Sequence, residues 1–248
     1  MSGHSKWASI KHKKAATDAK RGALFTKLIK EINVAARNGG GNMETNVALR
    51  TAVQKAKSGN MPWDNIDRAI KKGTGELPGV VYESIIYEGY GPGGVAILVE
   101  ALTDNKNRAS AEVRNLFSKK NGNLAGAGSV SWIFAKKGYI LVEKDKVNEE
   151  KLMDIALNAG AEDMKSEDDA YEITTSVSDL EKVKQALADN KIPIQEAEVT
   201  MVPSSLVKVT GQDAKNVLAL VETLEEHEDV QKVHANFDIP DEELEKTA

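Results

Sequence analysis

The chain has 248 residues, of which 41% are hydrophobic and 29% are charged, and this composition excludes collagen-like structure and wholesale disorder. The longest aliphatic stretch, Val95 to Val99, is far shorter than the ~20 apolar residues of a membrane span, and no apolar signal segment follows the basic N-terminus. Cysteine is absent, which excludes disulfides, thiolate metal ligands and cysteine nucleophiles. We therefore expect a soluble, cytoplasmic protein that does not bind membranes.

The net charge of −5 conceals an uneven distribution of charge along the chain. Residues 1–78 contain 15 Lys and Arg against 6 Asp and Glu, whereas the remaining residues carry a net charge of −14. This asymmetry is typical of a basic module for a polyanion joined to acidic domains that limit nonspecific association. A dipolar surface without a ligand is the alternative interpretation.

The basic part is expected to be a solvated arm followed by a small helical bundle. Residues 1–22 offer little apolar surface to bury and are rich in Lys, which predicts a solvated arm or a weak helix. Apolar residues then recur at helical spacing, with Gly or Pro at the boundaries, and predict helices over residues 24–39, 44–57 and 62–72.

Two features of these helices bear on function. On the first helix, Lys27, Lys30 and Arg37 fall opposite the apolar stripe, so we expect them to face solvent. Trp63 lies on the tight connection before the third helix, where we expect it to belong to a hydrophobic staple.

Strand-like alternation replaces helical spacing after the basic part. Strands over residues 80–91 and 95–103 flank a Pro-Gly-Gly hairpin signal, and a helix follows them. Residues 129–134, with the sequence SVSWIF, predict a further strand in which Trp132 and Phe134 are core residues.

The order of elements over residues 138–203 is βαββαβ, a split βαβ unit that closes a four-stranded sheet with two helices. The elements on either side of it must therefore belong together. The predicted fold is α+β and multidomain, with an N-terminal helical bundle followed by two ferredoxin-like α/β domains, one inserted in the other. The predicted domains are the arm and bundle (1–78), an α/β domain (79–137 plus 204–240), the inserted βαββαβ domain (138–203) and an acidic tail (241–248).

No sequence motif predicts catalysis or a bound cofactor. The glycines of GYGPGG precede a strand and lack the Lys-Ser/Thr of a phosphate-binding loop. His4, His12, His227 and His234 have no metal-ligand spacing, and the acidic segment around His227 is interpreted as a solvated turn. A serine nucleophile elbow is also absent. We predict no catalytic residue, no metal site and no cofactor.

The candidate functional residues are basic, because cations neutralise phosphates and an aromatic ring among them can stack on an exposed base. The predicted nucleic-acid-binding residues are Lys6, Trp7, Lys11, His12, Lys13, Lys14, Lys20 and Arg21 of the arm, Lys27, Lys30 and Arg37 of the first helix, and Lys106, Arg108, Arg114, Lys119 and Lys120 of the helix after Asp104. A solubilising tail is the alternative for the arm, and a solvated helix face is the alternative for the last group.

Several long blocks of the chain resemble the signature blocks of the YebC family, which includes the mitochondrial translational activator of cytochrome c oxidase. They are GHSKWASIKHKKAATDAKRGALFTKLIKEI, NMPWDNIDRAIKKGTGE, YEGYGPGGVAILVEALTDNKNRASAEVRNLFSKKNGNL and GSVSWIF, in that order. Trp63 stands where the family motif usually has Lys, and Ala125-Gly126-Ala127 replaces a more usual Gly-Thr-Ser.

The resemblance implies an N-terminal helical domain followed by two α/β domains, one inserted in the other. It also implies a cytoplasmic, non-enzymatic regulator of gene expression. Members of the family have been described as DNA-binding transcriptional regulators and as ribosome-associated factors that help translation through difficult sequences such as proline runs.

We favour a ribosome-associated translation factor that contacts rRNA. The exposed charges of the first helices are mostly Lys, which suits phosphate contact rather than bidentate base readout, and binding led by shape and phosphates is typical of RNA. A DNA-binding transcriptional regulatory protein is the alternative, although neither a clear recognition helix nor a dimerisation element matched to half-sites is evident, and a monomer is compatible with the sequence. A nucleic-acid-processing enzyme is a third hypothesis.

Overall fold

The computed structural model describes residues 18–167, 170–240 and 243. The chain divides into two compact units. The inserted unit comprises Trp132–Val207 and Asn236–Asp238, and the main unit comprises the described residues up to Ser131 together with Lys208–Ala235 and residues 239, 240 and 243. Across the described ranges, each helix is too short or too polar to span a bilayer.

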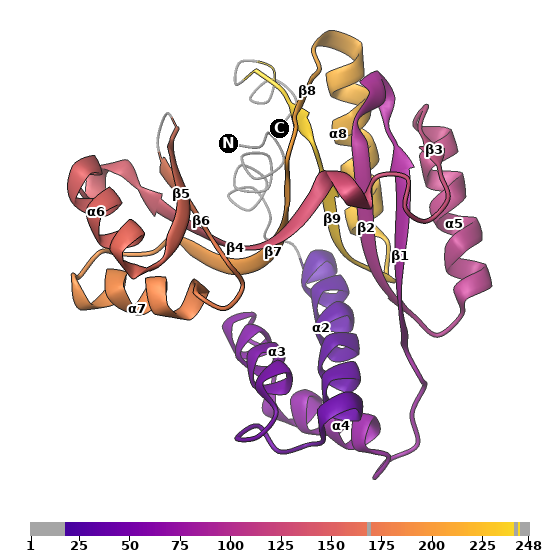
Figure 1. The fold of residues 1–248 in the computed structure, drawn as a ribbon. Coiled ribbons are helices and arrows are strands. Elements are labelled where there is room, and N and C mark those ends of the chain that lie inside the picture. Colours follow the sequence, from indigo (N-terminus) through magenta and orange to yellow (C-terminus); the bar gives the residue numbers. More distant parts are fainter. Residues whose placement is uncertain (1–17, 168–169, 241–242, 244–248) are drawn as a thin grey trace. The chain divides into compact units, whose positions relative to one another are not determined.

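The main unit begins with the predicted bundle of helices. These are α2 (Asp18–Gly39), α3 (Val47–Ser58) and α4 (Trp63–Thr74) (Figure 1). The side chain of Asn46 caps α3 by accepting a hydrogen bond from the Leu49 N–H, and α4 ends at Gly75, whose φ of 84° suits a residue without a side chain. The apolar faces form one core, with Ile32, Leu49 and Ile66 fully buried. The three predicted helices are confirmed.

Helix α4 approaches α2 closely at Gly73. A Cβ at this position would lie 2.8 Å from the Cβ of Ala36 and 2.5 Å from the carbonyl oxygen of Asn33. Both distances are shorter than van der Waals contact, so the absence of a side chain allows the two helices to pack at this separation.

The rest of the main unit is a four-stranded antiparallel sheet with two helices on one face (Figure 1). Its elements are β1 (Glu83–Tyr90), β2 (Ala96–Thr103), α5 (Lys106–Lys119), β3 (Asn123–Leu124), α8 (Gly211–Glu226) and β9 (Val230–Ala235). The strand order is β3-β1-β2-β9. The predicted hairpin joins β1 to β2, and the short helical turn η1 (Pro92–Gly94) is its loop.

The predicted strand over residues 129–134 is wrong. Residues 131–133 form the 3-10 turn η2 (Ser131–Ile133), because the carboxylate of Glu88 accepts hydrogen bonds from the N–H groups of Gly128, Val130 and Ser131 at 2.7–2.8 Å. Burial would raise the pKa of the Glu88 carboxyl, but these hydrogen bonds outweigh burial and lower it. These N–H groups therefore cannot join a sheet.

The turn also corrects one of the two core assignments made for this segment. Trp132 is 73% exposed rather than buried, whereas Phe134, the first residue of the next strand, is in the core as predicted.

The inserted unit has the predicted βαββαβ order. Its elements are β4 (Phe134–Glu143), the turn η3 (Lys144–Lys146), α6 (Glu149–Ala159), β5 (Ala161–Ser166), β6 (Ala170–Thr175), α7 (Leu180–Asp189) and β7 (Glu196–Pro203). The strand order β5-β6-β4-β7 is the ferredoxin-like order, and every pairing is antiparallel. Helices α6 and α7 cover one face (Figure 1), where Ile140, Ile173 and Leu187 are fully buried. The α+β fold with one ferredoxin-like domain inserted in another is confirmed.

The first and last strands of the inserted unit pair where they enter and leave it. Phe134 of β4 lies opposite Pro203 of β7, and beyond this pair the Ser204 N–H donates to the Ile133 carbonyl oxygen at 2.8 Å. After β7, the short strand β8 (Val207–Lys208) pairs with β10 (Phe237–Asp238). The boundaries that the sequence places at residues 138 and 203 stay a prediction.

Candidate nucleic-acid interface

The basic arm lies mostly outside the described residues. This holds for Lys6, Trp7, Lys11, His12, Lys13 and Lys14. Lys20 and Arg21 belong to α2, but their side chains are also outside the described part of the structure. The role of the arm in binding therefore stays a prediction.

The row of cations on α2 does not face solvent as predicted. Lys30 is buried, and its ammonium group donates to Asp229 Oδ1 at 2.5 Å and to the Glu228 carbonyl oxygen at 3.0 Å. Lys27 is half-buried and donates to the carbonyl oxygen of Glu225, in the last turn of α8, where the helix dipole favours a cation. The polar side of α2 is thus a contact surface within the main unit.

Arg37 is the one member of this row that keeps an exposed side chain. Its guanidinium makes a long hydrogen bond of 3.5 Å to the Tyr82 carbonyl oxygen. The expected exposure of Arg37 is confirmed, and its role in binding stays a prediction.

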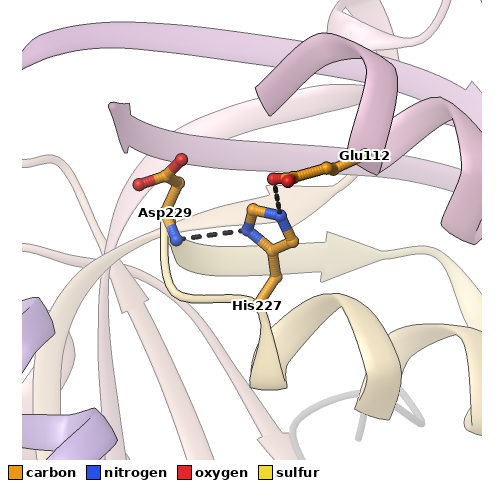
Figure 2. Close-up of side chains that lie close together, drawn as sticks. All are labelled: Glu112, His227 and Asp229. Carbon is orange, nitrogen blue, oxygen red and sulfur yellow. Dashed lines mark hydrogen bonds and ion pairs between the residues drawn. The ribbon is translucent and has the colours of Figure 1, made fainter. Parts of the chain in front are cut away.

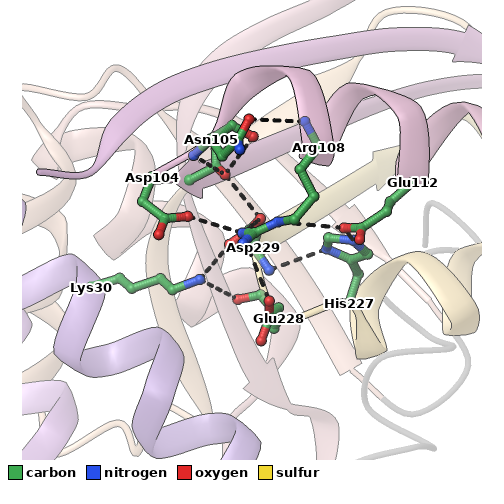
Figure 3. Close-up of polar contacts among 9 residues, drawn as sticks. Lys30, Asp104, Asn105, Arg108, Glu112, His227, Glu228 and Asp229 are labelled. Carbon is green, nitrogen blue, oxygen red and sulfur yellow. Dashed lines mark hydrogen bonds and ion pairs between the residues drawn. The ribbon is translucent and has the colours of Figure 1, made fainter. Parts of the chain in front are cut away.

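Asp229 is the centre of this contact surface (Figure 3). Its side chain is fully buried and accepts hydrogen bonds from Lys30, from Arg108 at 2.8 Å and from the Thr103 hydroxyl at 2.9 Å. Burial would raise the pKa of the Asp229 carboxyl, but the hydrogen bonds from these three groups outweigh burial and lower it. One carboxylate thus joins α2, β2 and α5 at the start of β9.

The same network contains a group with the donor atoms of a metal site. Ligand atoms of Glu112, His227 and Asp229 lie within 4.8 Å of one another. His227 Nδ1 accepts a hydrogen bond from the Asp229 N–H at 3.1 Å, so Nε2 carries the proton and donates to Glu112 at 3.0 Å (Figure 2). The Asp229 carboxylate is already occupied by two cations. We therefore assign the group to the internal network, since a metal ion would have to displace its hydrogen bonds.

The basic group of α5 divides into paired and unpaired members. Lys106 makes an ion pair with Glu83, and Arg108 contacts Asp104 and Asp229. Arg114 and Lys119 are exposed, Lys120 is half-buried, and none of these three has an ion-pair partner among the residues described. The guanidinium of Arg108 is held by carboxylates of its own chain, and its role in nucleic-acid binding stays a prediction.

The bundle presents a second set of cations that the sequence analysis did not single out. We call Arg50, Lys57, Arg68 and Lys72 the bundle cations. All four are exposed, and within the described ranges none is paired with a carboxylate. The helical pattern of the sequence could have identified them, because each of these cations lies off the apolar stripe of α3 or α4. Unlike the α2 row, these cations keep their charges toward solvent.

Comparison with known proteins identifies the relatives of this chain. The family model for the N-terminal domain of TACO1/YebC proteins matches residues 5–76, and the model for their second and third domains matches residues 82–237. The chain belongs to the TACO1/YebC family. It is 59% identical over 97% of its length to a "Probable transcriptional regulatory protein" of Natranaerobius thermophilus, covering 98% of that protein.

Two further proteins are similar to this chain over most of their length. A protein of the same name from Dictyoglomus turgidum is 58% identical, with 98% of each chain covered. The crystal structure of a conserved hypothetical protein from Aquifex aeolicus matches with a TM-score of 0.79 at 50% identity, covering 90% of this chain and 93% of that chain. The similarity therefore extends over the helical bundle and both ferredoxin-like parts.

Proposed function

We propose that the protein is a non-enzymatic, nucleic-acid-binding regulator of gene expression that acts as a ribosome-associated translation factor contacting rRNA. The observation that carries the proposal is the set of exposed Lys and Arg residues on the bundle and on α5 that have no carboxylate partner in the described part of the chain. Unpaired surface cations attract phosphates. When they bind, counterions of the nucleic acid are released, and this release makes the binding strong at low salt.

The distribution of these cations favours contact with the phosphate backbone. The bundle cations lie on α3 and α4, and Arg114 and Lys119 lie on α5, so they are not confined to one helix that could enter a major groove. Contacts of this kind fix position and orientation and read little sequence. Recognition of a folded RNA by its shape and phosphates fits this arrangement.

The proposed mechanism is positional. Two of the carboxylates with shifted pKa values, Glu88 and Asp229, are held by hydrogen bonds within the fold and have no free proton to exchange with a substrate. In this proposal the protein acts by binding and by stabilising a productive geometry of the peptide-synthesis machinery, including at difficult sequences such as proline runs. Turnover of labelled RNA or DNA by the pure protein would contradict a non-enzymatic role.

A DNA-binding transcriptional regulator is the second candidate function, because the relatives carry the name "Probable transcriptional regulatory protein". Such a protein would bind one promoter much more tightly than random DNA of equal length. A binding assay with both DNAs and with ribosomes therefore separates the two candidates.

Sedimentation of the full-length chain through a sucrose gradient with purified ribosomes tests the first proposal. We expect co-sedimentation that weakens as salt increases. The double substitution Arg68→Glu and Lys72→Glu should reduce it and lower the slope of log affinity against log salt by about 1.5, since each lost phosphate contact contributes about 0.7 to 0.9.

The matched control is Lys151→Glu with Lys182→Glu, which makes the same change in charge at exposed positions of α6 and α7. Equal effects of the two double variants would show that total charge, rather than the bundle, directs binding. Failure of the wild-type chain to sediment with ribosomes at any salt concentration would refute the ribosomal function.

A further inference from the structure

The connection between α3 and α4 holds a large aromatic side chain at the surface. Trp63, the first residue of α4, is 48% exposed. The sequence pattern predicts that Trp63 belongs to a hydrophobic staple, but that position is taken by Met61, which is 5% exposed and lies in the same buried cluster as Ile66. The packing of the bundle core therefore does not account for the tryptophan.

The backbone on both sides of Trp63 is fixed. The Gly59 N–H bonds to the Lys55 carbonyl oxygen and the Met61 N–H bonds to the Ala56 carbonyl oxygen, each at 2.9 Å. Met61 and Ile66 anchor the connection and the first turn of α4 in the core. The indole ring is thus presented from a rigid turn, and binding to it would cost little ordering of the backbone.

A cation accompanies the ring. The ammonium nitrogen of Lys57 lies 5.1 Å from the centroid of the Trp63 ring, within the range of a cation–π contact. Lys57 is itself one of the bundle cations. The pair therefore combines an exposed aromatic surface with a positive charge, and a ligand that matches both has a flat ring next to an anionic group.

We infer that Trp63 stacks on an unpaired nucleobase of the bound RNA while Lys57 contacts the adjacent phosphate. This inference rests on the proposed function and adds the kind of nucleotide that the bundle selects. Bases within a duplex are already stacked on one another, so the indole ring distinguishes single-stranded or bulged nucleotides from paired ones. The bundle cations contribute attraction that does not depend on base identity.

Binding of two fluorescent RNA oligomers of about 12 nucleotides tests the inference, one an oligoadenylate and the other a chain of abasic nucleotides with the same number of phosphates. Fluorescence anisotropy with the full-length protein gives the two affinities. We expect Trp63→Ala to weaken oligoadenylate binding about tenfold, because stacking of one base contributes about 1–3 kcal/mol and 1.4 kcal/mol is a factor of ten. The affinity for the abasic chain should not change.

Two further variants separate stacking from a structural effect. Trp63→Phe keeps an aromatic ring and should retain most of the affinity for oligoadenylate. Trp132→Ala removes the other described exposed tryptophan, in the inserted unit, and should leave both affinities unchanged. Thermal unfolding followed by circular dichroism confirms that each variant is folded.

The failure of the stacking site and the failure of the proposed function give different results. If Trp63→Ala weakens binding of both oligomers equally, or of neither, the stacking site is refuted while the nucleic-acid-binding function stands. If the wild-type chain binds neither oligomer at low salt, the proposed function is refuted and the stacking site with it.

Discussion

Replacing Asp229 with Asn tests whether one carboxylate holds the helical bundle against the sheet of the main unit. The substitution keeps the shape of the side chain and removes its charge. Lys30 would then be buried without a counter-ion, and the new amide group would offer hydrogen-bond donors where the wild-type carboxylate accepts from Arg108 and Thr103. We expect the loss of stability to arise mainly from the unpaired ammonium group.

The structure allows an estimate of the magnitude. Removing one partner of a buried ion pair costs about 3–5 kcal/mol, and Asn keeps one oxygen that accepts from Lys30, so we expect Asp229→Asn to cost about 3 kcal/mol. Lys30→Met leaves Asp229 with Arg108 and Thr103 and should cost about 1.5 kcal/mol. The double variant removes the buried ammonium together with the charge of its partner. It should therefore be more stable than the sum of the single effects predicts, by about 1–2 kcal/mol.

Urea unfolding followed by far-UV circular dichroism measures these free energies, and amide exchange in α2 and β9 reports the same change locally. Asp154→Asn on α6 is the matched control, because Asp154 is exposed and the same substitution there should change stability by less than about 0.5 kcal/mol. A central role of Asp229 is refuted if Asp229→Asn costs no more than Asp154→Asn, or if the effects at Lys30 and Asp229 add as those of independent sites do.

The pH dependence of the free energy of unfolding provides a second test of the role of Asp229. The pKa of Asp229 is lower in the folded protein than in the unfolded chain. Its contribution to stability is therefore fully present above the unfolded value of about 3.9 and is lost as the pH falls through the folded value. The difference between wild type and Asp229→Asn should shrink on acidification, and a constant difference would contradict the assignment.

Three other substitutions test separate parts of the fold. Glu88→Gln should cost about 2 kcal/mol and speed amide exchange at Gly128, Val130 and Ser131, because an amide has one oxygen where the carboxylate uses two; unchanged exchange would contradict this. Gly73→Ala should destabilise the bundle by about 1–3 kcal/mol in urea unfolding. Gly22→Ala on α2, where a Cβ meets nothing within 4 Å, should instead raise stability by up to about 1 kcal/mol. Equal effects of the two substitutions on stability would rule out the close approach of α4 to α2 at Gly73. Burial raises the pKa of the Glu172 carboxyl, although the 2.7 Å hydrogen bond from Tyr139 acts to lower it, so the folded protein disfavours the charged form. Glu172→Gln should therefore gain stability relative to wild type as the pH rises from about 4 to neutral. A difference in stability between the two proteins that does not vary with pH would count against this prediction.

Helical periodicity predicted the bundle because each helix buries its own apolar stripe. It did not predict the fate of the opposite side of α2, since Lys30 and its partner Asp229 are 199 residues apart in the chain. A polar face that contacts another element and a polar face in water have the same sequence pattern. Distinguishing them requires the tertiary fold, which is why Lys30 was expected to bind a ligand.

The βαββαβ order was predictable because alternation and helix boundaries are local signals, and one domain had to be inserted in the other once this order was recognised. The SVSWIF segment shows where local signals fail. Its alternation of small and large residues suits a strand, but Glu88, 40 or more residues earlier, takes the N–H groups that a strand would need. Trp132 is consequently at the surface.

The pairing of β4 with β7 at Phe134 and Pro203 means that the βαββαβ segment between these residues begins and ends at two neighbouring strand ends. Ends this close can be joined by a short turn, so the unit could be deleted or exchanged for another without separating the strands of the surrounding sheet. Once this segment is folded, its neighbouring ends hold the flanking parts of the main unit close together, which reduces the entropic cost of closing a long loop. The insertion is thus a position at which one domain could be exchanged for another, and its neighbouring ends help the two halves of the main unit to assemble.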